Sequence, residues 1–227
     1  MGEGTIIGPD TPVAELAARY PAVRVVLSRY GFGSYEDEEP PAGSVAGFAR
    51  ERGIPPERLV GEIERVLDLS RREPPPSSFL ALLETHEHLN ELFLLHQEAL
   101  LAQDIPLAAE LLKQVSEGQR EHIRVEEEIL LPVYARAGKI PGGDPKFYIN
   151  EHRKMIRILD HFEEMLPRLM DEGPGTMRRR VIELFDEGYW FKRLLEHHDE
   201  REESILYPVL DQVTTEEERR ELLERCL

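Results

Sequence analysis

The chain has 227 residues, of which 41% are hydrophobic and 32% are charged, a composition typical of a folded, helix-rich globular protein rather than a disordered one. Its 45 acidic and 28 basic residues give a formal net charge of −17, which argues against nucleic acid or an anionic membrane as the main partner. The single cysteine, Cys226, excludes disulfide frameworks and cysteine-held clusters within one chain. No apolar run approaches the roughly 20 residues of a membrane helix, and the N-terminus lacks a secretory hydrophobic segment, so a cytoplasmic location is expected.

The first 70 residues are expected to form a small helical domain. Short helices are predicted over residues 13–20, 22–30, 44–52 and 55–69. Thr11-Pro12 indicates an N-cap followed by a proline at the first helical position. The acidic, proline-bearing loop of residues 34–43 should be exposed. Residues 71–77 include three consecutive prolines, which cannot continue a helix, and we expect them to form a linker to a second domain over residues 78–227.

Four long helices are predicted after this linker, over residues 78–102, 105–137, 144–172 and 176–213. Their predicted N-terminal caps are Ser77 or Ser78, Asp104, Asp144 and Thr176. A terminal helix is expected after Thr215, where Thr-Glu-Glu-Glu forms a capping-box pattern. Four long helices joined by short loops are typical of an up-down-up-down bundle, and no strand-like alternation is visible. The fold class is therefore predicted to be all-α.

Two copies of one motif lie in the second and fourth of these helices. His122 and His198 are each followed four residues later by a glutamate, Glu126 or Glu202, and ten residues later by a proline. Four residues make just over one helical turn, so each imidazole and carboxylate share a face, with Cβ atoms about 5–6 Å apart. Chance alone explains one or two such spacings in a glutamate-rich chain. The shared context, with a second glutamate, an apolar pair and the proline, favours a pair of metal-binding motifs.

The first and third bundle helices each add one candidate ligand, His88 and His152. Each follows a glutamate and has apolar residues four and seven positions later, which predicts that it faces inward. His86, two residues from His88, is expected on the surface. Four histidines and two glutamates would then surround a pseudo-twofold axis and form a two-metal site.

Such a donor set suits iron or manganese better than structural zinc, which prefers four-coordinate sites that commonly contain cysteine. Two bridging carboxylates and four outer imidazoles leave positions for a bridging oxygen and for a small ligand such as O₂ or NO. A ferritin-like site needs Glu-x-x-His on two helices, and no histidine here has a glutamate three residues before it. The His-Glu-x-x-His motif of zinc proteases is also absent.

Residues of about 78–213 resemble the hemerythrin-like family, in its bacterial di-iron branch with four histidines and two bridging glutamates. The paired His-x-x-x-Glu-Glu motifs with their prolines carry the resemblance. It implies two non-haem iron ions with six protein ligands: His88, His122, His152 and His198 as terminal ligands, and Glu126 and Glu202 as bridges.

Residues 11–32 resemble the small helical domain that precedes the hemerythrin-like domain in proteins that repair iron centres. Those relatives carry a cysteine motif just after Gly-Phe, where this chain has Gly33-Ser34-Tyr35. The resemblance therefore implies their architecture without the chemistry of their cysteines.

The expected function is binding of O₂, NO or a related small oxidant, in sensing, scavenging or iron handling. Two alternatives stay open. One is an enzyme that reduces NO or peroxide, or that repairs iron–sulfur centres by delivering iron. The other is a regulatory module whose N-terminal domain mediates homodimerisation or docking of a protein partner. Tyr148, four residues before His152, either lines a ligand pocket or packs in the core.

Overall fold

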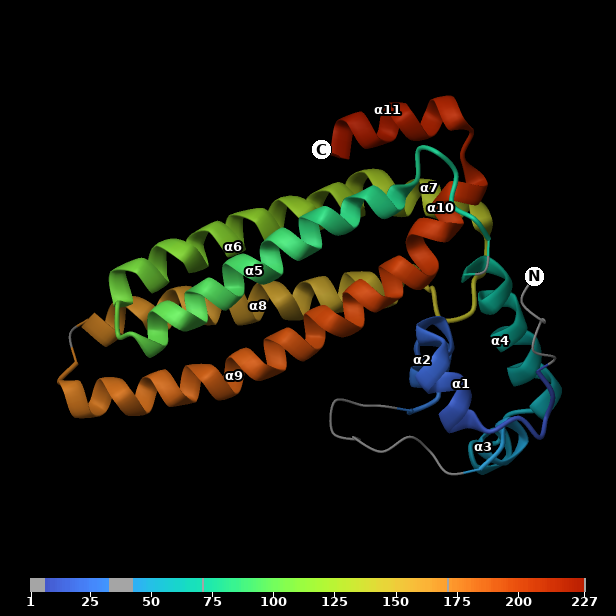
Figure 1. The fold of residues 1–227 in the computed structure, drawn as a ribbon, viewed down its shortest axis with the longest axis horizontal. Helices are drawn as coiled ribbons and strands as arrows, with labels where there is room; N and C mark the ends of the chain where they lie inside the picture. The colour runs from blue at the N-terminus through green and yellow to red at the C-terminus, as the bar shows by residue number, and fades with distance from the viewer. Residues whose placement is uncertain (1–6, 33–42, 71, 171, 227) are drawn as a thin grey trace.

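The computed structural model describes residues 7–32, 43–70, 72–170 and 172–226, and these ranges consist of helices joined by short loops. One isolated bridge between Pro12 and Ser44 is the only strand-like pairing of the described residues. Four long helices run along the length of the molecule, and the short N-terminal helices gather at one end (Figure 1). The prediction of an all-α fold is confirmed. None of the described helices is long and apolar enough to cross a membrane.

Four short helices form the N-terminal layer: α1 (Val13–Arg19), α2 (Pro21–Ser28), α3 (Val45–Glu51) and α4 (Pro56–Ser70). Ser44 caps α3, because its hydroxyl accepts a hydrogen bond from the Gly47 N–H at 3.2 Å. Helix α1 begins at Val13, as its predicted range does, but the cap is extended Pro12 rather than the predicted Thr11. Residues 33–42, which hold most of the predicted acidic loop and the Gly33–Tyr35 segment, lie outside the described ranges.

The bundle consists of α5 (Leu83–Leu101), α6 (Ile105–Val125), α8 (Pro145–Met170) and α9 (Pro174–Arg201). Each packs on the next in chain order, and α9 closes the bundle against α5. A 3₁₀ turn, Phe79–Leu82, leads into α5 and is capped by the Ser78 hydroxyl. Asp104 caps α6 as predicted, and Asp144 accepts from the Lys146 N–H at 3.0 Å at the start of α8. The predicted cap at Thr176 is wrong, because extended Gly173 and then Pro174 start α9 earlier.

Two π-helical turns, Glu126–Leu130 and Glu202–Leu206, follow α6 and α9 and lead into α7 (Leu131–Tyr134) and α10 (Tyr207–Val213). In each turn the backbone carbonyl of the glutamate accepts from the N–H five residues later, in Leu131 or Tyr207. The next residue in each copy is a proline, which has no N–H and whose ring clashes with the carbonyl four residues earlier. The predicted helices thus extend as far as expected, but each is widened at the glutamate of the repeated motif.

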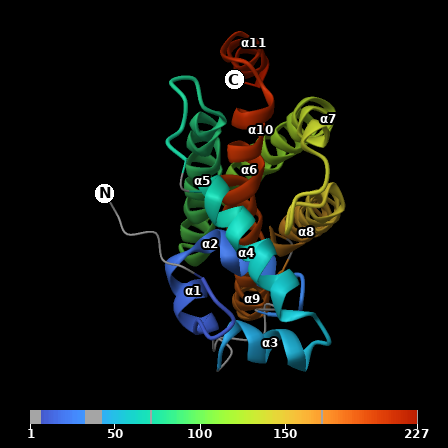
Figure 2. The ribbon, with the colours of Figure 1, turned by 90° about the vertical axis from the view of Figure 1, so that its right-hand side faces the viewer.

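The buried apolar side chains divide into two clusters. One fills the bundle between α5, α6, α8 and α9 at the end away from the N-terminal layer. The other combines the N-terminal helices with α7, α10 and the two π turns, and it includes Val25, Leu130 and Ile205. Helix α2 contacts α9, and α4 contacts the second π turn. Figure 2 shows these short helices covering that end of the bundle. The division at residues 71–77 stays a prediction, since the two parts share one core.

The chain closes with α11 (Glu216–Cys226), which starts as the capping pattern predicts. The Thr215 hydroxyl accepts from the Glu218 N–H at 3.2 Å. Arg219 donates to the Asp211 and Thr214 carbonyls at 2.6 and 2.8 Å and so fixes α11 to the end of α10. These contacts hold α10, and with it the second π turn, in a defined position.

Candidate metal centre

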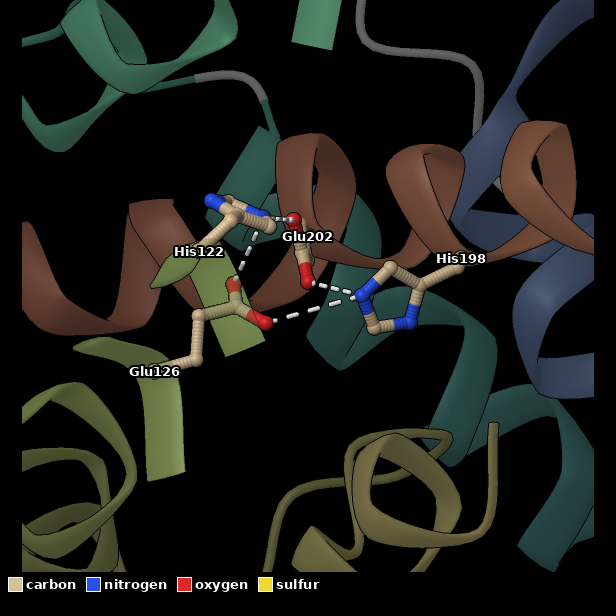
Figure 3. Close-up of side chains that lie close together, drawn as sticks. All are labelled: His122, Glu126, His198 and Glu202. Atoms are coloured by element: carbon tan, nitrogen blue, oxygen red, sulfur yellow. Dashed lines mark ion pairs between the residues drawn. The ribbon is translucent and has the colours of Figure 1, made fainter. Parts of the chain in front are cut away.

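The two repeated motifs converge inside the bundle at the end covered by the N-terminal layer. Each glutamate is the first residue of a π turn, and each histidine lies one helical turn before it, in α6 or α9. Figure 3 shows the carboxylates of Glu126 and Glu202 between the imidazoles of His122 and His198. These four side chains are buried, and their nearest nitrogen and oxygen atoms lie within 4.8 Å of one another.

Each carboxylate presents its two oxygens to opposite sides. Glu126 Oε1 lies 3.6 Å from His122 Nε2, whereas Oε2 lies 3.0 Å from His152 Nε2 and 3.5 Å from His198 Nε2. Glu202 Oε1 lies 2.5 Å from His198 Nε2, whereas its Oε2 lies 3.7 Å from His122 Nε2 and 3.0 Å from His86 Nε2. Both carboxylates therefore span the space between two pairs of imidazoles.

The imidazole pairs have matching geometry. His86 and His122 lie edge to face with ring centroids 4.7 Å apart, and His152 and His198 do the same at 4.8 Å. We call the first pair, with Glu126 Oε1 and Glu202 Oε2, the α5/α6 half-site. The second pair, with Glu126 Oε2 and Glu202 Oε1, is the α8/α9 half-site. The two half-sites reflect the internal repeat of the sequence.

Most of the converging atoms lack hydrogen bonds among the described residues, although His86 Nε2 and His122 Nε2 lie 3.1 Å apart and share one. Within the described part of the chain, the following buried atoms have no hydrogen-bond partner: both oxygens of Glu126, Oε1 of Glu202, and Nε2 of His152 and of His198. Burying an ionised carboxylate without a partner costs several kcal/mol. A metal cation in each half-site would compensate this cost by accepting electron pairs from the same atoms. The residues present thus fit a two-cation group.

Outer hydrogen bonds fix two of the imidazoles. His152 Nδ1 donates to Glu127 Oε1 at 2.8 Å, and His198 Nδ1 donates to Glu151 Oε2 at 3.1 Å. Each bond places the proton on Nδ1 and leaves Nε2 free to bind a metal, and the carboxylate partner increases the basicity of the ring. In the α5/α6 half-site, His86 Nδ1 has no hydrogen-bond partner among the described residues, and its nearest carboxylate oxygen is 3.8 Å away in Asp199.

The two buried carboxylates also change the pKa values of the side chains around them. Burial lowers the pKa of His122, but the negative charges of Glu126 and Glu202 outweigh burial and raise it to about 9. In the metal-free protein this ring is therefore protonated on both nitrogens at neutral pH. A metal that binds Nε2 must displace the proton there. Burial raises the pKa of Tyr207 well above its ordinary value, and the charges of Glu202 and Glu126 raise it further. The Tyr207 hydroxyl remains protonated and donates to Glu202 Oε2 at 3.0 Å.

The structure brings together five of the six residues selected from the sequence: His122, Glu126, His152, His198 and Glu202. His88 is not among them, because its side chain is exposed. The expectation that His86 lies on the surface is wrong. His86 is buried and points its Nε2 at Glu202, and it takes the position in α5 that was predicted for His88.

A regular pattern in the sequence identifies the correct histidine. Buried residues follow His86 at intervals of 3, 7, 10 and 14 positions: Leu89, Phe93, His96 and Leu100. The same intervals after His152 give Met155, Leu159, Phe162 and Leu166, all of them buried. The two helices that each supply one histidine to the cluster thus share one helical phase. The i+4 and i+7 positions after His88 indicate the wrong face, since Leu92 is only partly buried and Leu95 is exposed.

Two tyrosines near the site differ in role. Tyr148 is fully buried and lies edge to face with His198, with ring centroids 6.1 Å apart. Its hydroxyl has no hydrogen-bond partner within the described residues, and its ring also packs edge to face on Tyr134. Tyr207, which the sequence motif contains only as the residue before the proline, contacts the cluster directly. Its hydroxyl oxygen lies 3.2 Å from His86 Nε2.

Comparison with known proteins agrees with this geometry. The family model described as "Hemerythrin HHE cation binding domain" matches residues 79–210. A search of curated proteins and a search of solved structures gave no match. The matched segment covers more than half of the chain and contains the buried histidine and glutamate cluster that could hold a metal ion. The chain therefore belongs to the hemerythrin family, as a member with a cation-binding HHE domain.

Proposed function

We propose that the protein is a non-haem di-iron protein that binds O₂, NO or a related small oxidant, in sensing, scavenging or iron handling. The observation that carries the proposal is the pair of half-sites. Two buried carboxylates each direct one oxygen to each pair of histidine Nε2 atoms, and several of these atoms lack any hydrogen bond among the described residues. The proposed ligands are His86, His122, Glu126, His152, His198 and Glu202, with His86 replacing His88.

Donor chemistry supports iron as the metal. Imidazole nitrogen suits zinc, copper, iron and nickel, whereas carboxylate oxygen also suits manganese and magnesium. A mixed set of four imidazoles and two carboxylates, without a thiolate, fits iron first and manganese second. Structural zinc sites are commonly tetrahedral and contain cysteine, and the single Cys226 lies in α11, outside the cluster. Iron bound here would supply a redox-active pair with room for a small ligand.

The protein residues have distinct tasks in this proposal. Glu126 and Glu202 hold the two half-sites together. Glu127 and Glu151 keep the protons of His152 and His198 on Nδ1, so that both rings present Nε2 to the centre. The Tyr207 hydroxyl places its proton at the α5/α6 half-site, because it donates a hydrogen bond to Glu202 there.

The α5/α6 half-site is the better candidate for the side on which a small ligand arrives. His86 and His122 retain 6% and 8% exposure, whereas His152 and His198 retain 1% and 0%. Asp199 beside His86 is partly exposed, with 23% of its side-chain surface accessible. A small ligand bound on this side would lie beside the phenolic proton of Tyr207, whose oxygen is 3.2 Å from His86 Nε2.

The test is metal analysis of the purified protein together with its optical spectrum. The proposal predicts about two iron ions per chain and the absorption of a bridged ferric pair. Fewer than about two metals per chain, unaffected by Glu126→Ala or Glu202→Ala, would overturn it. Stopped-flow mixing of the reduced protein with O₂, NO or H₂O₂ then separates a binding protein from an enzyme, because turnover of any of the three would favour the enzyme.

A further inference from the structure

Arg201 is a buried cation next to the α8/α9 half-site. It lies in α9, three residues after His198, and only 3% of its surface is exposed. The guanidinium lies over the Phe147 ring, with its central carbon 5.0 Å from the ring centroid. Burying a guanidinium is costly unless its donors are paired, so the partners of Arg201 reveal what its position serves.

One partner leads to the metal centre. Arg201 Nη2 donates to Glu151 Oε1 at 3.0 Å, and Nε lies 3.4 Å from Oε2 of the same carboxylate. Glu151 Oε2 in turn accepts from His198 Nδ1 at 3.1 Å. Burial raises the pKa of Glu151, but the hydrogen bond from His198 and the charge of Arg201 lower it to about 2. The Glu151 carboxylate is therefore ionised, and it is held by His198 and Arg201, both in α9.

A second partner leads to the N-terminal layer. Arg201 Nη1 donates to the Gly142 carbonyl at 2.7 Å, in the loop before α8. Gly142 has a φ of +73°, and a β-carbon there would lie 3.2 Å from Val25 Cγ1 of α2. The positive φ favours glycine, and a β-carbon there would require Val25 to move by a few tenths of an ångström. Next to Arg201, Glu200 pairs with Arg24 of α2 at 3.3 Å. Helix α2 thus packs against the loop that Arg201 holds.

We propose that Arg201 is a positioning residue that orients His198 through Glu151, and that docking of α2 against Gly142 keeps Arg201 in place. The N-terminal layer is then part of the outer support of the metal centre, and its removal weakens the α8/α9 half-site. This inference rests on the proposed two-metal function, but the orientation of His198 can also be measured without metal.

The first experiment compares Arg201→Met and Arg201→Lys with Arg193→Met in the full chain. Arg193 lies in the same helix and pairs with exposed Glu196, so its loss removes a similar side chain while leaving the Arg201–Glu151 pair in place. Nuclear magnetic resonance of the metal-free protein reports the His198 Nδ1 proton. We expect a signal protected from exchange in the unmodified protein and in Arg193→Met. In Arg201→Met the protection is lost, and in Arg201→Lys it is reduced. Equal protection in all four proteins overturns the inference.

The second experiment measures iron retention against a competing chelator. Loss of an outer partner of a metal ligand typically weakens metal binding about 10–100-fold. Arg201 acts one contact further out, through Glu151, so Arg201→Met should weaken the binding of one of the two iron ions by no more than that factor. Arg193→Met should weaken the binding of neither. If the unmodified protein does not hold two iron ions, the proposed function fails, and the metal-free measurement still decides the role of Arg201.

Two valine variants test the contribution of α2. Val25 and Val45 are both fully buried, but Val25 packs on Gly142 whereas Val45 lies in α3, which packs mainly on α4. Val25→Ala should lower iron retention several-fold and accelerate exchange of the His198 proton, and Val45→Ala should do neither. Identical retention and exchange in the two variants would show that α2 does not support the metal centre.

Discussion

The two copies of the repeated motif agree in their histidine, glutamate and proline and differ at two buried positions between them. In both copies the histidine, the glutamate, the π turn and the proline occupy equivalent positions. Three residues after the histidine, however, one copy has Val125 and the other has buried Arg201. Nine residues after it, one copy has Leu131 and the other Tyr207.

These differences make the two half-sites chemically distinct. Arg201 supports the α8/α9 half-site through Glu151. Tyr207 belongs to the same motif copy but contacts the other half-site, at Glu202 Oε2 and His86. The repeat thus supplies a symmetric set of proposed ligands. The surroundings give one half-site a buried cation behind Glu151 and give the other a nearby phenolic proton and more exposure.

The largest expected effect is the loss of a bridging carboxylate. Glu202 lies close to three imidazoles, so Glu202→Ala removes a ligand from both half-sites at once and should abolish binding of the metal pair. Glu203→Ala, which changes an exposed neighbour, provides the matched control and should retain about two metals per chain. Metal analysis of the two variants checks this, and equal loading of both would show that the carboxylate does not bridge the half-sites.

A smaller effect is expected from one terminal ligand. His86→Ala removes an imidazole from the α5/α6 half-site only, so the variant should lose up to half of its metal. His88→Ala should retain metal as the unmodified protein does, because His88 is exposed. Metal content and the optical spectrum distinguish the two. If His88→Ala loses metal and His86→Ala does not, the assignment made from the structure is reversed.

The pair His86 and His88 also shows how far the sequence determines the site. A repeated motif made four of the residues predictable, because it fixes each histidine and its glutamate about one helical turn apart. These residues are His122, Glu126, His198 and Glu202. The histidine that α5 supplies has no such motif, and its prediction depends on which face of the helix is buried. That face follows from Leu89, Phe93 and Leu100, and an error of two residues rotates the prediction to the opposite side.

The helix ends could be predicted from residues next to them in sequence, whereas the long-range packing could not. Ser78, Asp104 and Thr215 cap their helices with side chains next to them in sequence. The shared core of the N-terminal layer and the bundle end has no local signature. Neither the contact of Val25 with Gly142 nor the role of Arg201 could be inferred without the fold.

A still smaller effect, on stability rather than on metal content, is expected from removing the phenolic hydroxyl of Tyr207. Tyr207→Phe deletes the hydrogen bond to the Glu202 carboxylate, and hydrogen bonds to charged groups contribute about 1.5–3 kcal/mol. The free energy of unfolding of the metal-free protein should fall by about that amount, as measured by urea titration, while metal stoichiometry is unchanged. Tyr189→Phe, on the exposed face of α9, is the control. A loss no larger than the control value would show that the hydroxyl is not important there.

The smallest effect concerns the shape of the π turn. Pro132→Ala restores a backbone N–H and removes the ring that clashes with the Glu128 carbonyl, so the widened turn is no longer imposed. Glu126 should then shift relative to His122, and iron retention against a chelator should fall severalfold. Pro106→Ala, in the first turn of α6, removes no such constraint and should leave retention unchanged. Equal iron retention in the two variants would show that the surrounding packing, and not Pro132, imposes the π turn.

The central claim is that two metals lie side by side between two bridging carboxylates, and X-ray absorption at the iron edge of the loaded protein tests it most directly. We expect a metal–metal distance within about 4 Å, as in two-metal sites generally, and an average of two imidazoles per iron. Glu203→Ala should keep the metal–metal signal, whereas Glu202→Ala should bind too little iron to show one. An iron spectrum without a neighbouring metal in the fully loaded, unmodified protein would contradict the account.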